Sequence, residues 1–360
     1  PNLDFKIMQG NSLITTFRGQ YVDLDTKHDF QRQSYTKIMQ NMRQLTKEQN
    51  AFYNSNSKER SEHEINIKHL ILDSIISQLD YEFGSWRATN YATPNIFGGK
   101  AEKGKKSKYA QDFSKERMDI LSDCGKLDEE LMDSSKSLKV RSQIAVPFFD
   151  WHIMFNDVFN RPNKQGFDIV IANPPYGASY PISQKEYFKG HFKSAQTKQG
   201  IQKGSLDTFT LFIEQGYNLL CKEGCFAYIV PISITSSDAM MGIHRLLLSN
   251  CNPIYISSYA VRPKPVFENA VVNTSIIMMR KTENRCEHLY ATKMYRRDEG
   301  KFSLACLMSN LQYTNVLDYM LIGRIPKIGL EIEESILSKL SKLPKLSTFL
   351  DTEGNPIFYR

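Results

Sequence analysis

The chain has 360 residues, of which 41% are hydrophobic and 24% are charged, so it can bury a core large enough for two domains. The formal net charge of +7 permits a nucleic-acid partner without requiring one. No stretch approaches the roughly 18 consecutive apolar residues that a membrane span needs, and the opening residues, PNLDFKIMQG, lack the pattern of a signal peptide. We therefore expect a cytoplasmic protein without a membrane partner.

The spacing of cysteine and histidine gives no sign of a metal site. The six cysteines are scattered without a CxxC pair, and His152 has no partner at ligand spacing. The sequence therefore predicts neither a bound metal nor a disulfide framework.

The first 145 residues contain a short apolar segment and a long polar one. The segment LDFKIMQGNSLI, residues 3–14, is typical of a strand that turns at Gly10 and Asn11. Residues 25–145 are rich in Gln, Lys and Ser, and their apolar positions recur at helical spacing, as between Ile65 and Leu79. We interpret this region as a helical insertion that is partly disordered around residues 98–110.

Strands and helices alternate between residues 167 and 281. Four runs rich in Ile, Val and Tyr are predicted to be buried strands: FDIVIANPP, GCFAYIVP, PIYISSYAV and AVVNTSIIMMRK. The segments TFTLFIEQGYNLL and SSDAMMGIHRLLLSN have helical periodicity, so the pattern predicts an open α/β sheet. A proline-rich link joins the last two strands without a helix, which indicates an antiparallel pair at the sheet edge.

The segment after Lys281 is more polar and has no self-contained core. EIEESILSKLSKL is predicted to form a helix that ends before Pro344. We interpret residues 1–282 as one domain and residues 283–360 as the start of a second.

The strand FDIVIA ends in an unusual motif, Asn-Pro-Pro-Tyr-Gly, at residues 173–177. Both prolines lack an N–H and fix φ, so the chain must leave the sheet in one rigid, extended turn. Because ligands bind at the carboxyl ends of strands in α/β sheets, this turn is a candidate site.

The motif offers acceptors for a planar NH2 group. Asn173, through its side-chain oxygen, and Pro174, through its backbone carbonyl, can accept the two N–H hydrogens without a charge to desolvate. Such acceptors would localise the lone pair of an aromatic amine for in-line attack on a sulfonium methyl group. Tyr176 is predicted to stack on the target ring, and a base in a duplex would have to be flipped out at a cost of roughly a few kcal/mol.

The motif and its neighbours resemble those of gamma-group adenine-specific (N6) DNA methyltransferases, of the type IIG restriction-modification and phage-defence kind. The resemblance implies a Rossmann-like methyltransferase sheet, S-adenosylmethionine as the methyl donor and double-stranded DNA as the partner. It also implies that Asn173, Pro174, Pro175 and Tyr176 are the catalytic residues.

Further segments resemble the same family in the same order. QGNSLI resembles a segment that contacts the adenosine of the cofactor, which here implies Asn11, and the helix after the motif implies Phe212 as a wall of the cofactor pocket. PVFENAVVNTSIIMM resembles the segment that supplies a second aromatic against the flipped base, which maps onto Phe267.

Basic residues follow the motif directly. We expect phosphate contacts from this cluster because of its place beside the candidate site. Its proposed DNA-binding members are Lys185, Lys189, Lys193 and Lys198.

The glycine-rich cofactor loop of the family has no counterpart here, because FGGK at residues 97–100 lacks a preceding strand. We therefore expect a fragment that begins after that loop and lacks part of the cofactor site.

Two other functions remain open. A glutamine side-chain amide, the target of methyltransferases that act on translation release factors, presents the same two N–H groups. A catalytically incomplete fragment would only bind DNA or a partner. The helical insertion, the lysine cluster and the C-terminal segment favour DNA, with residues 1–282 as the methyltransferase domain and residues 283–360 as the start of a target-recognition domain.

Overall fold

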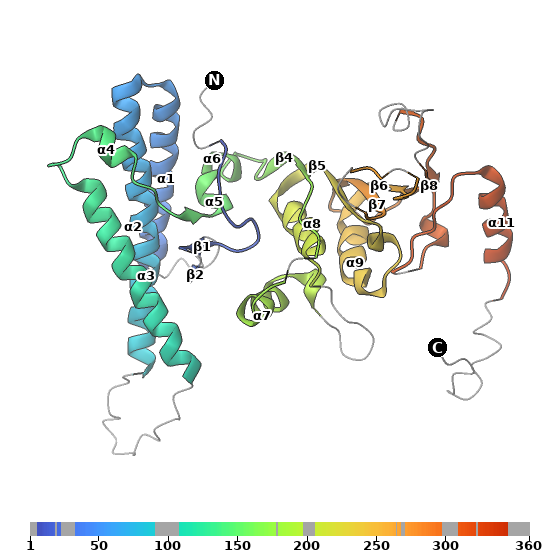
Figure 1. Cartoon of the computed structure of the whole chain (residues 1–360), viewed down its shortest axis with the longest axis horizontal. Coiled ribbons are helices and arrows are strands. Elements are labelled where there is room, and N and C mark those ends of the chain that lie inside the picture. Colours follow the sequence, from blue (N-terminus) through green and yellow to red (C-terminus); the bar gives the residue numbers. More distant parts are fainter. Residues whose placement is uncertain are drawn as a thin grey trace, which may run out of the picture. The chain divides into compact units, whose positions relative to one another are not determined.

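The computed structural model describes residues 6–18, 20–22, 33–90, 108–177, 179–196, 206–263, 265–267, 271–296, 309–321 and 323–344. The chain divides into two compact units, Pro1–Arg161 and Pro162–Arg360 (Figure 1). None of the helices within the described ranges is long and apolar enough to cross a membrane.

The first unit is mainly helical. Its elements are α1 (Gln33–Asn54), α2 (Ser57–Asn90), α3 (Lys108–Met132), α4 (Leu138–Ser142), α5 (Trp151–Met154), α6 (Asn156–Phe159) and the short strands β1 (Thr16–Phe17), β2 (Gln20–Tyr21) and β3 (Phe148–Phe149). The three strands form a small antiparallel sheet in the order β2-β1-β3. Buried side chains such as Ile38, Leu72 and Leu131 form one core. The helices predicted between residues 25 and 145 are confirmed, whereas the stretch expected to be disordered lies outside the described residues up to position 107.

The strand predicted at residues 3–14 is wrong for its described part. Residues 6–14 form turns and bends. The Asn11 Oδ1 atom accepts the backbone N–H of Leu13 at 2.9 Å and that of Ile14 at 3.3 Å. This local side-chain bonding offers the backbone an alternative to a strand ladder, which explains the turn.

The second unit is a mixed α/β structure. Its strands are β4 (Phe167–Ala172), β5 (Leu220–Pro231), β6 (Cys251–Tyr259), β7 (Thr274–Lys281), β8 (Leu289–Tyr295) and β9 (Thr314–Asn315). Its helices are α7 (Ile182–His191), η1 (Lys193–Ala195), α8 (Thr208–Leu219), η2 (Ile232–Thr235), η3 (Asp238–Met240), α9 (Met241–Asn250), η4 (Leu317–Tyr319) and α11 (Glu331–Ser341). The predicted α/β class, the four strands between residues 167 and 281 and the helices between them are confirmed.

The strand order corrects one expectation. The sheet runs β4-β5-β7-β6-β8-β9, and β6 and β7 are antiparallel as predicted. They do not form the sheet edge, because β7 lies between β5 and β6 while β8 pairs in parallel outside β6. Leu289 and Ala291 of β8 are buried, but the polar residues around them obscure the apolar pattern by which a buried strand is recognised in a sequence. Residues after Lys281 therefore extend this sheet, and the domain boundary expected at residue 282 stays a prediction.

Helices α8 and α9 cover one face of the sheet (Figure 1). Gly216 lets α8 approach closely, since a Cβ there would lie 2.6 Å from the Tyr228 hydroxyl oxygen. On the opposite face, Ile169 and Ile171 of β4 are 64% and 74% exposed. The main core of this unit therefore lies on the α8–α9 side.

A buried histidine ties α9 to the C-terminal part of the unit. The His244 Nε2 atom lies 2.6 Å from the carbonyl oxygen of Ile234, and the backbone N–H of Gly323 donates to His244 Nδ1 at 3.2 Å. This pattern requires the neutral ring with its hydrogen on Nε2. Burial lowers the pKa of His244, which keeps the ring neutral.

His244 should make the stability of the protein pH-dependent. Its folded pKa lies below the ordinary value of about 6.5, so the unfolded chain takes up a proton first as the pH falls. Its contribution is fully present above about pH 6.5 and is lost as the pH falls through the folded pKa. We expect urea unfolding midpoints to fall more steeply with acidification in the wild type than in His244→Asn, which keeps an acceptor near Nδ1 but does not titrate.

The matched control is His288→Asn, because His288 is an exposed histidine of the same unit. The slope of midpoint against pH should be smaller in His244→Asn than in His288→Asn, which separates the effect of His244 from the loss of a histidine elsewhere in the unit. Equal slopes for the wild type and His244→Asn would contradict the assignment.

Candidate active site

The strand pairing fixes where the Asn-Pro-Pro-Tyr motif leaves the sheet. β4 and β5 are parallel, and their last paired residues are Ala172 and Tyr228. Asn173 therefore emerges beside Ile229, at the edge formed by the carboxyl ends of both strands. Asn173 is exposed, whereas Pro174 is buried. Gly177 has φ of 68°, a left-handed conformation that favours glycine, and it ends the motif.

Tyr176 connects the motif to the neighbouring strand. Its hydroxyl oxygen lies 3.1 Å from Asn173 Oδ1 and 3.1 Å from the backbone carbonyl oxygen of Ile229. The ring is half-buried and packs against the core that α8 and α9 form with the sheet. Burial raises the pKa of the Tyr176 hydroxyl, so it remains a hydrogen-bond donor at neutral pH. The structure thus brings Asn173, Pro174 and Tyr176 together and anchors them.

The two other predicted aromatics of this unit belong to the same edge of the sheet. Phe212 lies in the second turn of α8, whose C-terminus leads directly into β5, and is half-buried against the core. Phe267 is half-buried in the link between β6 and β7. Since β5 and β6 are both antiparallel to β7, this link begins at the same edge as Asn173. The three strand spacings between β4 and β6 amount to about 14 Å.

Asn11 belongs to the first unit. Its Oδ1 atom is already held by the turn at residues 11–14, so its Nδ2 group is the part left to bind a ligand. Pro175 is exposed and makes the second rigid step of the turn.

The predicted lysines follow the motif on α7 and η1. Lys185 is half-buried on α7, whereas Lys189 on α7 and Lys193 on η1 are exposed. Lys198 lies outside the described residues.

A buried carboxylate holds the lysine-bearing segment, which consists of α7 and η1, in place. Glu214 of α8 is buried, and its two oxygens accept the backbone N–H groups of Lys193 at 2.8 Å and of Ser194 at 2.7 Å. Gly242 of α9 leaves room for the segment, because a Cβ there would lie 2.9 Å from the carbonyl oxygen of Ser194. Sequence reasoning missed Glu214, although a single carboxyl group within the apolar helix TFTLFIEQGYNLL was the available signal.

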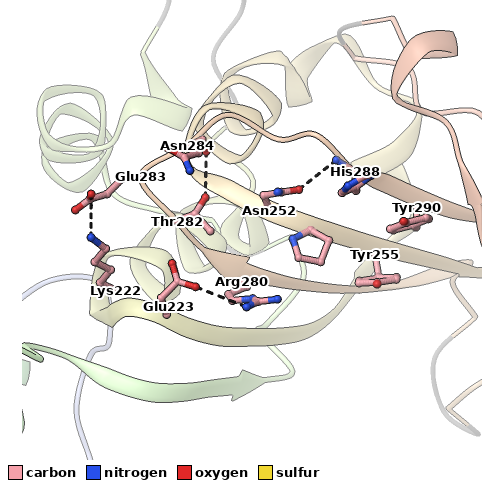
Figure 2. Close-up of a pocket in the computed structure, with 11 residues that line it drawn as sticks. Lys222, Glu223, Asn252, Tyr255, Arg280, Thr282, Glu283, Asn284, His288 and Tyr290 are labelled. Atoms are coloured by element: carbon pink, nitrogen blue, oxygen red, sulfur yellow. Dashed lines mark hydrogen bonds and ion pairs between the residues drawn. The ribbon is translucent and has the colours of Figure 1, made fainter.

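A pocket of about 530 Å³ lies at the opposite edge of the sheet (Figure 2). Its wall includes Lys222 at the start of β5, seven residues along that strand from Ile229, and Arg280 near the end of β7, which pairs with Cys225, four residues from Ile229. Both cations are paired, Lys222 with Glu283 at 3.0 Å and Arg280 with Glu223 at 3.6 Å. The pocket therefore offers no unbalanced positive charge, and it is separate from the candidate active site.

The sequence matches the family described as Eco57I restriction-modification methylase over residues 35–267, more than half of the chain. The chain therefore belongs to the Eco57I restriction-modification methylase family. The resemblance to restriction-modification methyltransferases is thereby confirmed.

Two curated relatives illustrate this membership. The type II restriction enzyme and methyltransferase RM.Eco57I of Escherichia coli is 26% identical over 168 residues, which are 44% of this chain and 15% of that protein. The type II methyltransferase M.TthHB8I of Thermus thermophilus is 32% identical over 72 residues, which are 19% of this chain and 16% of that protein. The chain thus spans a small part of the length of these relatives.

Among solved structures, the DrdV–DNA complex matches with a TM-score of 0.32 and 14% identity, over 42% of this chain and 17% of that chain. A similarity at this level has no bearing on function.

The Glu214 carboxylate should be needed to hold the lysine-bearing segment. Glu214→Gln replaces one acceptor oxygen by an NH2 group that faces a backbone N–H, so one buried donor loses its partner. We expect the free energy of unfolding in urea to fall by roughly 1–3 kcal/mol. The control, Glu283→Gln, alters an exposed ion pair and should change it by less than about 0.5 kcal/mol. A Glu214→Gln protein as stable as its control would contradict this role.

Proposed function

We propose that this chain carries the methyl-accepting site of an adenine-specific DNA methyltransferase that uses S-adenosylmethionine and acts in restriction-modification or phage defence. The observation that carries the proposal is the geometry at the carboxyl end of β4. There the side chain of Asn173 is exposed at the sheet edge, and the Tyr176 hydroxyl lies beside it, 3.1 Å from Asn173 Oδ1 and 3.1 Å from the Ile229 carbonyl oxygen. Membership of a restriction-modification methylase family favours DNA over a protein amide as the target.

Two acceptors prepare the target amine in this mechanism. Asn173 Oδ1 and the Pro174 carbonyl oxygen accept the two N–H hydrogens of the exocyclic amine, which localises the nitrogen lone pair. S-adenosylmethionine, when bound, supplies an electrophilic methyl group whose bond to sulfur breaks as the bond to nitrogen forms. Asn173 and Pro174 need not act as bases, because the nitrogen becomes acidic only once it carries the methyl group and then releases its proton to water.

The aromatic residues of this edge fit the other requirements. A base can reach Asn173 only outside the duplex, and we propose that Tyr176 and Phe267 stack on it there. Phe212 presents a half-buried ring at the same edge, which suits the wall of a site for a nucleoside cofactor. In the first unit, Asn11 keeps its Nδ2 group as a donor for the cofactor contact that we propose for it, since its oxygen is held by the turn.

The segment between Tyr176 and α8 supplies positive charge for the DNA backbone. Lys189 and Lys193 are exposed, and Glu214 fixes the segment that carries Lys193. A charged side chain on a fixed backbone loses less conformational freedom when it binds a phosphate. We propose that Lys185, Lys189, Lys193 and Lys198 contact phosphates on double-stranded DNA.

Substitution of Asn173 tests the proposal. In the complete protein that contains this chain, Asn173→Ala removes one amine acceptor, so methyl transfer from labelled S-adenosylmethionine to duplex DNA should fall by roughly 10²- to 10³-fold. Asn284→Ala is a matched control, because Asn284 is an exposed asparagine at the opposite edge of the sheet and should leave the rate unchanged.

Two results would overturn the proposal. Full activity in Asn173→Ala would refute the role of the acceptor pair. Methylation of a release-factor glutamine by the wild type, with none on DNA, would refute the substrate.

A further inference from the structure

The Tyr176 hydroxyl faces two acceptors but has one hydrogen. Asn173 Oδ1 and the carbonyl oxygen of Ile229 each lie 3.1 Å from it. Only one of them can receive the hydrogen at a given moment, while the hydroxyl oxygen can also accept a hydrogen bond. The two acceptors therefore compete.

The Ile229 carbonyl oxygen is the acceptor that the Tyr176 hydroxyl should prefer. The pairing of β4 with β5 ends at Ala172 and Tyr228, so Ile229 extends one residue beyond the ladder. No further residue of β4 pairs with Ile229. The Tyr176 hydroxyl lies 3.1 Å from its carbonyl oxygen instead and can donate a hydrogen bond to it. A backbone carbonyl left without a donor in such a half-buried place is costly, which favours donation from Tyr176.

The acceptor that receives the Tyr176 hydrogen decides the orientation of the Asn173 side-chain amide. If the hydroxyl donates to Asn173, the amide oxygen faces Tyr176 and the NH2 group faces outward. If the hydroxyl donates to Ile229, the amide turns by 180°, its NH2 group donates to the hydroxyl oxygen, and its oxygen faces outward. Rotation about the last torsion of an asparagine side chain is soft, so the hydrogen bonds select the orientation.

The two orientations suit different targets. An outward oxygen accepts an N–H and therefore binds an amino group, whereas an outward NH2 group binds a ring carbonyl oxygen. We propose that the Tyr176 hydroxyl, held by the Ile229 carbonyl, is a positioning group that turns the Asn173 amide oxygen outward and so makes the site select an amino base over an oxo base. This inference rests on the proposed function, because it assumes that Asn173 receives the target amine.

A double-mutant cycle in the complete protein separates this role from stacking. Tyr176→Phe keeps the ring and removes the hydroxyl, so we expect kcat for methyl transfer to fall by roughly tenfold while KM for DNA changes by less than about twofold. In the Asn173→Asp background both side-chain oxygens are acceptors and orientation no longer matters. There Tyr176→Phe should lower kcat by less than about twofold.

The control is Tyr290→Phe, which removes a hydroxyl from the same sheet at the pocket of Figure 2 and should leave kcat unchanged. An equal loss from Tyr176→Phe in both Asn173 backgrounds would overturn the proposal, and so would no loss in either. Urea unfolding of each variant checks that the fold is retained.

A binding measurement provides a readout that does not depend on turnover. Duplexes with adenine or hypoxanthine at the target position differ in having an amino or an oxo group. We expect the wild type to bind the adenine duplex more tightly than the hypoxanthine duplex. In Tyr176→Phe the ratio of the two dissociation constants should be about tenfold smaller. An unchanged preference would refute the selection role.

The proposed function can fail separately. It fails if Asn173→Ala retains full methyl transfer to DNA. If Asn173→Ala is inactive while Tyr176→Phe matches the wild type in rate and in preference, only the positioning role fails.

Discussion

The register of the parallel pair β4–β5 is the constraint on which the site depends. Because the ladder ends at Ala172 opposite Tyr228, the two prolines come where pairing must stop, and Asn173 emerges next to Ile229. Tyr176 then reaches the Ile229 carbonyl as a substitute for the next strand residue. A slip of one residue would turn the β4 side chains to opposite faces and break this arrangement. The site is therefore a consequence of backbone pairing more than of any single side chain.

The two faces of the sheet differ in how far they are covered. α8 and α9 close one face, and Gly216 permits the close approach of α8 to the sheet. On the other face Ile169 and Ile171 stay largely exposed, although strands in parallel arrangement are usually covered on both sides. We expect further chain or a partner to pack on this side of β4.

Local patterns in the sequence were enough for the strands and helices between residues 167 and 281 and for locating the motif. The apolar runs around FDIVIA and GCFAYIVP predicted the strands correctly, and the order of Asn173, Pro174 and Tyr176 is the basis of the proposed chemistry of the turn. Strand order was misjudged, because the insertion of β7 between β5 and β6 depends on pairings between distant residues. β8 was missed, because its buried residues, Leu289, Ala291 and Thr292, do not form an apolar run in the sequence.

The supporting interactions could not be predicted from local patterns. Glu214 and His244 act on backbone groups of other elements, and backbone groups carry no sequence signal. The Tyr176–Ile229 bond is of the same kind, since any residue at position 229 would provide a carbonyl oxygen. Such contacts require the register and the helix packing to be known first.

Nucleoside analysis of methylated DNA tests the central claim most directly. Duplex DNA treated with the complete protein and S-adenosylmethionine would be digested to nucleosides and analysed by mass spectrometry. We expect N6-methyladenine as the methylated product, since the proposed substrate of the acceptor pair is the exocyclic amine of adenine. Formation of 5-methylcytosine instead would contradict the account, because methylation at a ring carbon makes no use of the acceptors at Asn173 and Pro174.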